Sequence, residues 1–243
     1  MSATPPTPAA SFASDNAAGV APEVMDALVA ANAGPALAYG DDPWTEQAIG
    51  EVRELFGQPV EVVWCWGGTG ANVVGLASVL QGWQSVIATD TAHIVVDECG
   101  APVRFSGSTI TPVPHVDGKL TPAAVEPFLG WQGSEHHVQP RVLSVSQVTE
   151  MGTRYSADEL GSLADLAHAH DLLLHVDGAR IANAVAAAGG DIRSMIVETG
   201  VDLLTFGLTK NGAMYGEAVV YLRPELAAHA AFIAKLDDPV WLR

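Results

Sequence analysis

The chain has 243 residues, 49% of them hydrophobic, and a formal net charge of -17 at pH 7. This length and composition allow a sizeable core and predict one large domain, or a domain with a fragment of a second. The 11 lysines and arginines are too few and too dispersed to bind a phosphate backbone, which excludes nucleic acid as a partner. No apolar run predicts a membrane segment and the start lacks the basic region of a signal peptide, so we expect a cytoplasmic protein.

The composition changes near the start of the chain. Residues 1–11 are rich in proline, alanine, serine and threonine, which predicts a disordered tail before a domain spanning residues 12–243. The two cysteines, Cys65 and Cys99, are far apart and without further cysteines nearby. They are interpreted as reduced, buried thiols, and no disulfide framework or metal site is expected.

Strand-like and helix-like segments alternate along the rest of the chain. Short apolar runs predict strands, and apolar residues at helical spacing predict helices between them. Alternation of this kind indicates an α/β fold with a mainly parallel sheet and helices on both faces, in which functional side chains gather beyond the strand carboxyl ends. The predicted strands are 61–66, 85–88, 141–145, 172–176, 202–206 and 218–222, and the clearest predicted helices are 71–80 and 156–170.

A glycine-rich turn, Gly67-Gly68-Thr69-Gly70, separates the first predicted strand from its helix. Glycines let backbone amides approach a ligand, and a helix N-terminus attracts negative charge, so the turn suits a phosphate. A tight turn without a ligand explains the motif equally well. The spacing fits neither a nucleotide P-loop nor a dinucleotide fingerprint.

An aspartate and an arginine, Asp177 and Arg180, follow a strongly apolar strand. A buried carboxylate needs a cationic partner, and a protonated pyridine nitrogen is one candidate. Alternatively, Asp177 and Arg180 form a structural ion pair, or Asp177 caps the next helix.

Lys210 lies among small and apolar residues just beyond another strand, with Thr209 beside it. Such surroundings favour a neutral amine, which can form an imine with an aldehyde, and the Thr209 hydroxyl can bind a phosphate. A solvated loop lysine is the alternative.

His93, also beyond a strand end, can stack on a conjugated ring or exchange protons, although a lone histidine is more often a surface or core residue. Together the four motifs meet the requirements of pyridoxal phosphate.

In these motifs the chain resembles the threonine aldolase and β-eliminating lyase family of fold-type I pyridoxal-phosphate enzymes. The resemblance implies the large domain of that fold, with the small C-terminal domain apparently missing. The motifs that carry it, in family order, are Ser14-Asp15-Asn16, Tyr39-Gly40-Asp41-Asp42-Pro43, Gly68-Thr69-Gly70-Ala71-Asn72, His93, His175-Val176-Asp177-Gly178-Ala179-Arg180 and Leu208-Thr209-Lys210-Asn211-Gly212.

The resemblance also implies a role for each site residue. Lys210 would bond the cofactor aldehyde, Asp177 would pair with the ring nitrogen, Arg180 would approach the ring oxygen and the substrate, and His93 would stack on the ring. The phosphate would be held by Gly68, Thr69, Gly70 and Thr209. Ser14 would approach the substrate carboxylate, and Tyr39 would border the site of a partner subunit in a homodimer or homotetramer.

The implied reaction is cleavage of threonine, or a related β-hydroxy-α-amino acid, into glycine and an aldehyde, with His93 or a water it positions as the base. Two alternatives stay open: another fold-type I lyase that performs β-elimination, and a truncated chain that binds cofactor without turnover. Three departures from the family bear on substrate preference and turnover: Ala13 in place of an arginine, Glu150 in place of a histidine, and an end at Arg243 without the family's C-terminal arginine.

Overall fold

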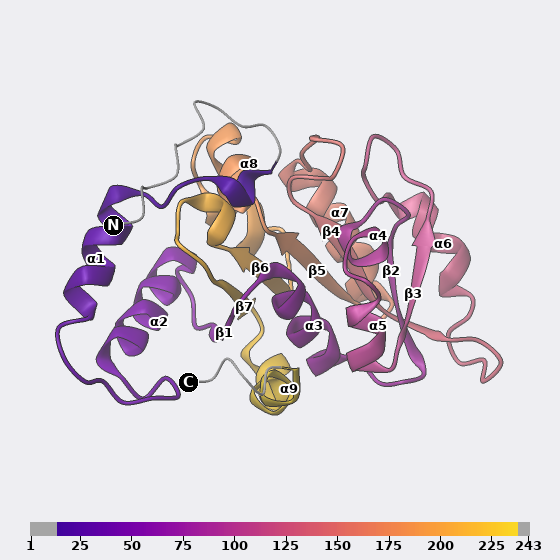
Figure 1. Ribbon diagram of the computed structural model, residues 1–243. Coiled ribbons are helices and arrows are strands. Elements are labelled where there is room, and N and C mark those ends of the chain that lie inside the picture. The colour runs from indigo at the N-terminus through magenta and orange to yellow at the C-terminus, as the bar shows by residue number, and fades with distance from the viewer. Residues whose placement is uncertain (1–13, 238–243) are drawn as a thin grey trace.

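The computed structural model describes residues 14–237, and the predicted tail at residues 1–11 lies outside this part of the chain. Its centre is a seven-stranded sheet in the order β1-β7-β6-β5-β4-β2-β3 (Figure 1). The strands are β1 Glu61–Cys65, β2 Gln84–Thr89, β3 Thr109–Val113, β4 Gln139–Ser146, β5 Leu173–Gly178, β6 Leu203–Gly207 and β7 Glu217–Tyr221.

The sheet is mainly parallel, as the sequence predicts. Parallel pairing joins β3, β2, β4, β5 and β6, whereas β7 runs antiparallel to both β6 and β1. Because β7 is reversed, its first residue, Glu217, pairs with Gly207 and Cys65 at the ends of its two neighbours. The start of β7 therefore lies at the edge of the sheet where the parallel strands end.

Helices cover both faces of the sheet, which also confirms the predicted fold class. One core contains Phe56 of α2 and Leu160 of α7, and the second contains Val74 of α3 and Ala234 of α9. The helices are α1 Pro22–Ala31, α2 Pro43–Phe56, α3 Gly68–Val79, α4 His93–Val96, α5 Ala101–Ser106, α6 Pro122–Leu129, α7 Ala157–Ala169, α8 Ile181–Ala187 and α9 Ala230–Asp237, with short 3-10 or π turns at Asp15–Ala17, Arg193–Val197, Thr209–Asn211 and Pro224–His229.

Helix α3 lies against the sheet because its facing residues are small. A Cβ added to Gly75 would meet Val219 of β7 at 3.3 Å and Leu203 of β6 at 3.5 Å. All residues from Ala71 to Ser78 are buried, so α3 is enclosed on nearly every side. This packing fixes the N-terminus of α3, and with it the glycine turn, at the edge of the sheet.

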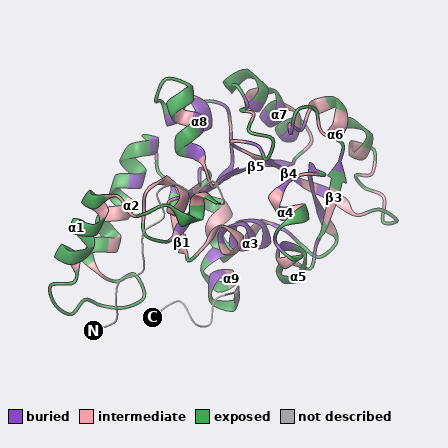
Figure 2. Cartoon of the chain, turned by 45° about the horizontal axis from the view of Figure 1, so that its top comes forward, coloured by how far each residue is buried: buried purple, intermediate pink, exposed green. Residues whose placement is uncertain are grey.

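Helix α1 differs from the others because none of its residues is buried. Figure 2 shows it at the side of the molecule, coloured almost entirely as exposed or intermediate. Its apolar side chains Met25, Leu28 and Val29 are 39%, 41% and 71% exposed. Exposed apolar side chains gathered on one helix are typical of a surface that another chain covers.

Several sequence predictions need correction. The first strand ends at Cys65, and its helix begins at Gly68 rather than at residue 71, so the glycine turn forms the first turn of α3. Cys65 is half-buried and Cys99 is exposed, so the prediction of two buried thiols was wrong. Cys99 lies in the turn before α5 and has a φ of 52°. Its side chain is exposed because such turns run over the protein surface. Among the described helices, none combines the length and apolar character needed to cross a membrane.

Candidate active site

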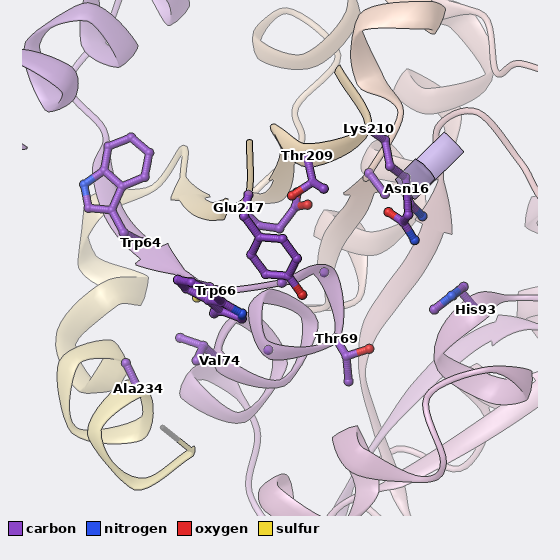
Figure 3. A pocket seen from close by; sticks show the side chains of 16 residues that line it. Asn16, Trp64, Trp66, Thr69, Val74, His93, Thr209, Lys210, Glu217 and Ala234 are labelled. Carbon is purple, nitrogen blue, oxygen red and sulfur yellow. The ribbon is translucent and has the colours of Figure 1, made fainter. Parts of the chain in front are cut away.

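The predicted cofactor residues surround a cavity of about 670 Å³ at the edge where the parallel strands end (Figure 3). Elements far apart in sequence form its wall: the end of β1, the start of α3, the start of α4, the turn before β7 and α9. A smaller adjoining cavity shares His93 and Lys210 with the first and adds Asp177 and Arg180. The sequence-predicted residues in the main cavity are Gly68, Thr69, Gly70, His93, Thr209 and Lys210.

The glycine turn presents the backbone amides of α3 to the main cavity. Its N-cap is Gly67, which supplies no side-chain hydrogen bond to the helix. The first amides of a helix have no partner within the helix, and their partial positive charge attracts anions. Gly68 has open space where a Cβ would lie, since no heavy atom is within 4 Å of that position. The residues present therefore fit a phosphate group.

Thr209 also lines the main cavity. Its hydroxyl donates to the Gly216 carbonyl oxygen at 3.2 Å and accepts from the Gly216 amide at 3.0 Å. These bonds close the loop that returns the chain to β7. A phosphate contact by the Thr209 hydroxyl would therefore replace its bond to the Gly216 carbonyl.

Lys210 is the central residue of the 3-10 turn Thr209–Asn211 and lines both cavities. The next residue, Asn211, fixes the turn by donating from Nδ2 to the Gly207 carbonyl at 2.8 Å and the Ala179 carbonyl at 3.1 Å. Gly212 then adopts a φ of 100°, a left-handed conformation that glycine adopts without strain. The lysine is thus attached to the ends of β5 and β6.

Asp177 is 7% exposed at the end of β5. Its Oδ2 accepts from Asn72 Nδ2 at 2.9 Å, and its Oδ1 accepts from the Ala179 amide at 3.0 Å. Within the described residues it forms no ion pair, so the alternative of an Asp177–Arg180 pair is wrong. A buried carboxylate that has hydrogen bonds but no cation fits a protonated ring nitrogen.

Arg180 instead binds Asp15 of the N-terminal arm. Its Nη2 donates to Asp15 Oδ1 at 3.0 Å, and its Nε donates to Oδ2. The hydrogen bond from Arg180 is the main reason that the pKa of Asp15 is lowered. The arm is therefore held by a residue that lines the smaller cavity.

His93 begins α4 and is held by two acidic residues. Its Nδ1 lies 2.9 Å from Glu98 Oε1, and its backbone amide donates to Glu150 Oε1 at 3.0 Å. The hydrogen bond with Glu98 raises the pKa of His93 above its usual value. Glu150, which stands where some family members have a histidine, also accepts from Ser146 Oγ at 2.6 Å and lines the smaller cavity.

The structure does not bring Ser14 or Tyr39 into the two cavities. Ser14 caps the Asp15–Ala17 turn by accepting from the Asn16 amide at 3.2 Å, and Asn16 lines the main cavity in its place. Tyr39 is 74% exposed, with Lys235 Nζ 5.9 Å from its ring centroid. The role of Tyr39 at the site of a partner subunit stays a prediction.

Sequence reasoning missed Glu217, which lines the main cavity and is the first residue of β7, just before the predicted strand 218–222. It is 3% exposed, its Oε2 accepts from the Leu208 amide at 3.1 Å, and burial raises its pKa to about 7. An aromatic pair was also missed: Trp66 and Tyr215 lie with ring centroids 4.7 Å apart and line the cavity. A carboxylate at the first position of a buried strand was the only sequence signal for Glu217.

The sheet, with a lysine turn, a buried aspartate and a glycine turn at one edge, defines the large domain of the fold-type I pyridoxal-phosphate enzymes. Comparison with known proteins specifies the group further. The chain belongs to the beta-eliminating lyase family, whose sequence profile matches residues 11–236. The resemblance seen in the motifs is thereby confirmed.

Among its relatives, the low specificity L-threonine aldolase of Pseudomonas aeruginosa is 39% identical over 252 residues, which cover 96% of this chain and 73% of that protein. The structure of Leishmania major threonine aldolase superposes with a TM-score of 0.86 at 32% identity, covering 92% of this chain and 65% of that chain. A putative L-allo-threonine aldolase from Listeria monocytogenes shares the fold, with a TM-score of 0.66 at 18% identity. The chain thus spans about two thirds of the Leishmania chain.

Proposed function

We propose that the protein is a pyridoxal-phosphate-dependent aldolase that cleaves L-threonine, or a related β-hydroxy-α-amino acid, to glycine and an aldehyde. The observation that carries the proposal is the convergence of Lys210, Asp177, His93 and the α3 N-terminus on two adjoining cavities. Relatives named as threonine aldolases at 39% and 32% identity support the same reaction.

Each residue of the site has a task that its surroundings explain. The α3 amides and the hydroxyls of Thr69 and Thr209 would hold the phosphate, and Lys210 would supply the amine that bonds the aldehyde. Asp177 would keep the ring nitrogen protonated, because its buried carboxylate is stabilised by a cation. When bound, the protonated ring serves as the electron sink for the pair released at Cα.

The protein groups around the substrate would orient it and move its protons. A base takes the β-hydroxyl proton as the Cα–Cβ bond breaks, and the Cα atom is then protonated to give glycine. His93 is the candidate base, and Glu150 lies beside it in the smaller cavity. Arg180 lines the smaller cavity and would bind the substrate carboxylate. Its guanidinium would then be shared between that carboxylate and Asp15.

We also propose that the protein acts as a homodimer or homotetramer. The exposed apolar side chains of α1, and the exposed Leu37, Tyr39 and Trp44 that follow it, support an interface there. Size-exclusion chromatography with light scattering measures the mass directly. A monomer at all concentrations would contradict this part of the proposal.

The test of the function is product formation by purified protein with added pyridoxal phosphate. Threonine should yield acetaldehyde and glycine, and the absorbance band of the bound cofactor should be lost in Lys210→Ala. Lys119→Ala is the matched control, because Lys119 is outside both site cavities and pairs with Glu159. The family description favours β-elimination as a second candidate, and pyruvate and ammonia from serine or cysteine without acetaldehyde from threonine would establish it instead.

A further inference from the structure

A single side-chain amide connects two buried carboxylates behind the site. Asn72 Nδ2 donates to Glu98 Oε1 at 2.8 Å and to Asp177 Oδ2 at 2.9 Å. Asn72, Glu98 and Asp177 are 1%, 4% and 7% exposed. The same Glu98 oxygen lies 2.9 Å from His93 Nδ1. The proposed ring-stacking histidine and the proposed ring-nitrogen partner are therefore linked through two residues that have no role in the proposed function.

The orientation of the Asn72 amide follows from its other contacts. Its Oδ1 accepts from the Thr205 hydroxyl at 2.8 Å, and Thr205 Oγ1 lies 3.1 Å from His175 Nε2. His175 Nδ1 in turn lies 2.9 Å from Ser144 Oγ. Because the Thr205 hydroxyl has given its only proton to Asn72, His175 must donate from Nε2, and Ser144 must donate to Nδ1. Burial lowers the pKa of His175 to about 4, which agrees with this neutral ring.

The same reasoning fixes the proton on His93. An ionised carboxylate accepts hydrogen bonds and donates none, so the contact with Glu98 Oε1 requires the proton on His93 Nδ1. Glu98 Oε2 is buried without a hydrogen-bond partner among the described residues, so Oε1 receives both the His93 and Asn72 bonds. In neutral His93, Nε2 is then the atom with a free lone pair.

We propose that Glu98 is a positioning residue: it holds the proton of His93 on Nδ1, so that Nε2 is the atom that exchanges protons with the substrate, and Asn72 keeps Glu98 in place. This inference rests on the proposed function only in taking the substrate as the group that exchanges protons with Nε2. The arrangement of carboxylate, imidazole and reacting group follows the principle by which an acidic side chain selects the tautomer of a catalytic histidine.

Other charges face His93 besides Glu98. Asp177 adds to the rise in its pKa, whereas Lys210 opposes it. Glu150 contacts the His93 backbone amide rather than its ring. Among the described residues, Glu98 is the one that hydrogen-bonds the His93 ring. Removal of its charge should therefore affect the His93 tautomer, and removal of a distant charge should not.

Nitrogen-15 NMR of the histidine-labelled, cofactor-free full chain tests the proposal, with His93 assigned from the spectrum of His93→Gln. In the wild-type protein, the neutral ring should carry its proton on Nδ1. In Glu98→Gln the titration midpoint of His93 should move to lower pH, and Nε2–H should become populated. Glu159→Gln is the matched control, because it removes a surface carboxylate paired with Lys119, and it should change neither property.

A neutral wild-type His93 with its proton on Nε2 overturns the proposal, and so does a Glu98→Gln protein with the wild-type tautomer and midpoint. If Glu98→Gln does not fold, the wild-type tautomer alone decides. Pyridoxal phosphate binding by the wild type is measured separately, by fluorescence titration. Absence of binding would contradict the proposed function, while the tautomer would still test the role of Glu98.

Discussion

Arg180 at the start of α8 and Asp15 in the N-terminal arm are joined by two hydrogen bonds, although 165 residues separate them in sequence. The arm is attached at a second point, where the Ala21 amide donates to the Gly212 carbonyl at 2.9 Å. Both contacts involve segments next to Lys210 or Asp177. The arm therefore forms part of the site, and its retention depends on a charged residue of that site.

Asp15→Asn should release the arm. The amide cannot complete a charged two-bond pair with Arg180, and charge-assisted hydrogen bonds are the stronger kind. Thermolysin should cut the variant faster between residues 14 and 42, as measured by mass spectrometry. Asp26→Asn on exposed α1 removes the same charge without contacting Arg180, and its cleavage rate should match the wild type. Equal rates for all three proteins would show that the pair does not hold the arm.

The wild-type arm should also respond to acid. The Asp15 carboxyl has a lowered pKa because of Arg180, so its contribution to stability is complete above the ordinary value of 3.8 and is lost as the pH falls through the lower folded value. The wild type should approach the cleavage behaviour of Asp15→Asn only below pH 3.8. An acid-stable protease such as pepsin can measure this change.

Glu217 should destabilise the cofactor-free protein as the pH rises. Its pKa is raised from 4.5 to about 7, so the folded state binds more protons than the unfolded state between these values, and stability falls with increasing pH. The loss amounts to on the order of 3 kcal/mol at full ionisation. Glu217→Gln should therefore gain Tm relative to the wild type between pH 5 and pH 8. A constant Tm difference would contradict the raised pKa.

The same carboxyl should affect cofactor affinity, because it lines the cavity proposed for the phosphate. Above pH 7 an ionised Glu217 would repel the phosphate, so the affinity of the wild type should decline more steeply with pH than that of Glu217→Gln. Pyridoxal, which lacks the phosphate, serves as the comparison ligand in the same titration. The difference between the two proteins should disappear with pyridoxal, and its persistence would place Glu217 away from the phosphate.

Two glycines should respond in opposite ways to alanine. A Cβ on Gly207 would lie 2.7 Å from the Ala179 carbonyl carbon, which is backbone and cannot turn aside, so Gly207→Ala should cost about 3 kcal/mol or more. Gly161 in α7 has nothing within 4 Å of that position, so Gly161→Ala should stabilise the protein by about 0.5–1 kcal/mol. Urea unfolding measures both values. Destabilisation of similar size in both variants would contradict the packing at Gly207.

Activity should depend on pH through His93 if it is the base. Glu98 raises the pKa of His93 above 6.5, so the neutral ring disappears as the pH falls through that higher value, and kcat/KM for threonine should fall with it. His93→Phe should lose about 10²–10⁴-fold in kcat/KM and this pH dependence. Glu150→Gln tests whether Glu150 is the base instead. If Glu150→Gln removes the fall of kcat/KM at low pH and His93→Phe does not, Glu150 is the base.

The sequence alone predicted the α/β class, most strands, and the positions of Lys210, Asp177 and His93 beyond strand ends. These features are local: apolar runs report burial, and chain order places loops at one edge of a parallel sheet. The reversal of β7 was not predicted, because the composition of the apolar run 218–222 does not show in which direction the strand runs. Glu217 was missed because its place at the site depends on that reversed pairing, and its position at a strand end was a weak signal by itself.

Only the tertiary structure decided which charged groups meet. It paired Arg180 with Asp15 rather than with Asp177 three residues away, and it placed Glu98 and Asn72 between His93 and Asp177. Such pairs depend on distances across the fold and on burial, which strengthens hydrogen bonds and makes unpaired charges costly. The chain order therefore determined the chemical groups available at the site, whereas packing determined their partners and their protonation.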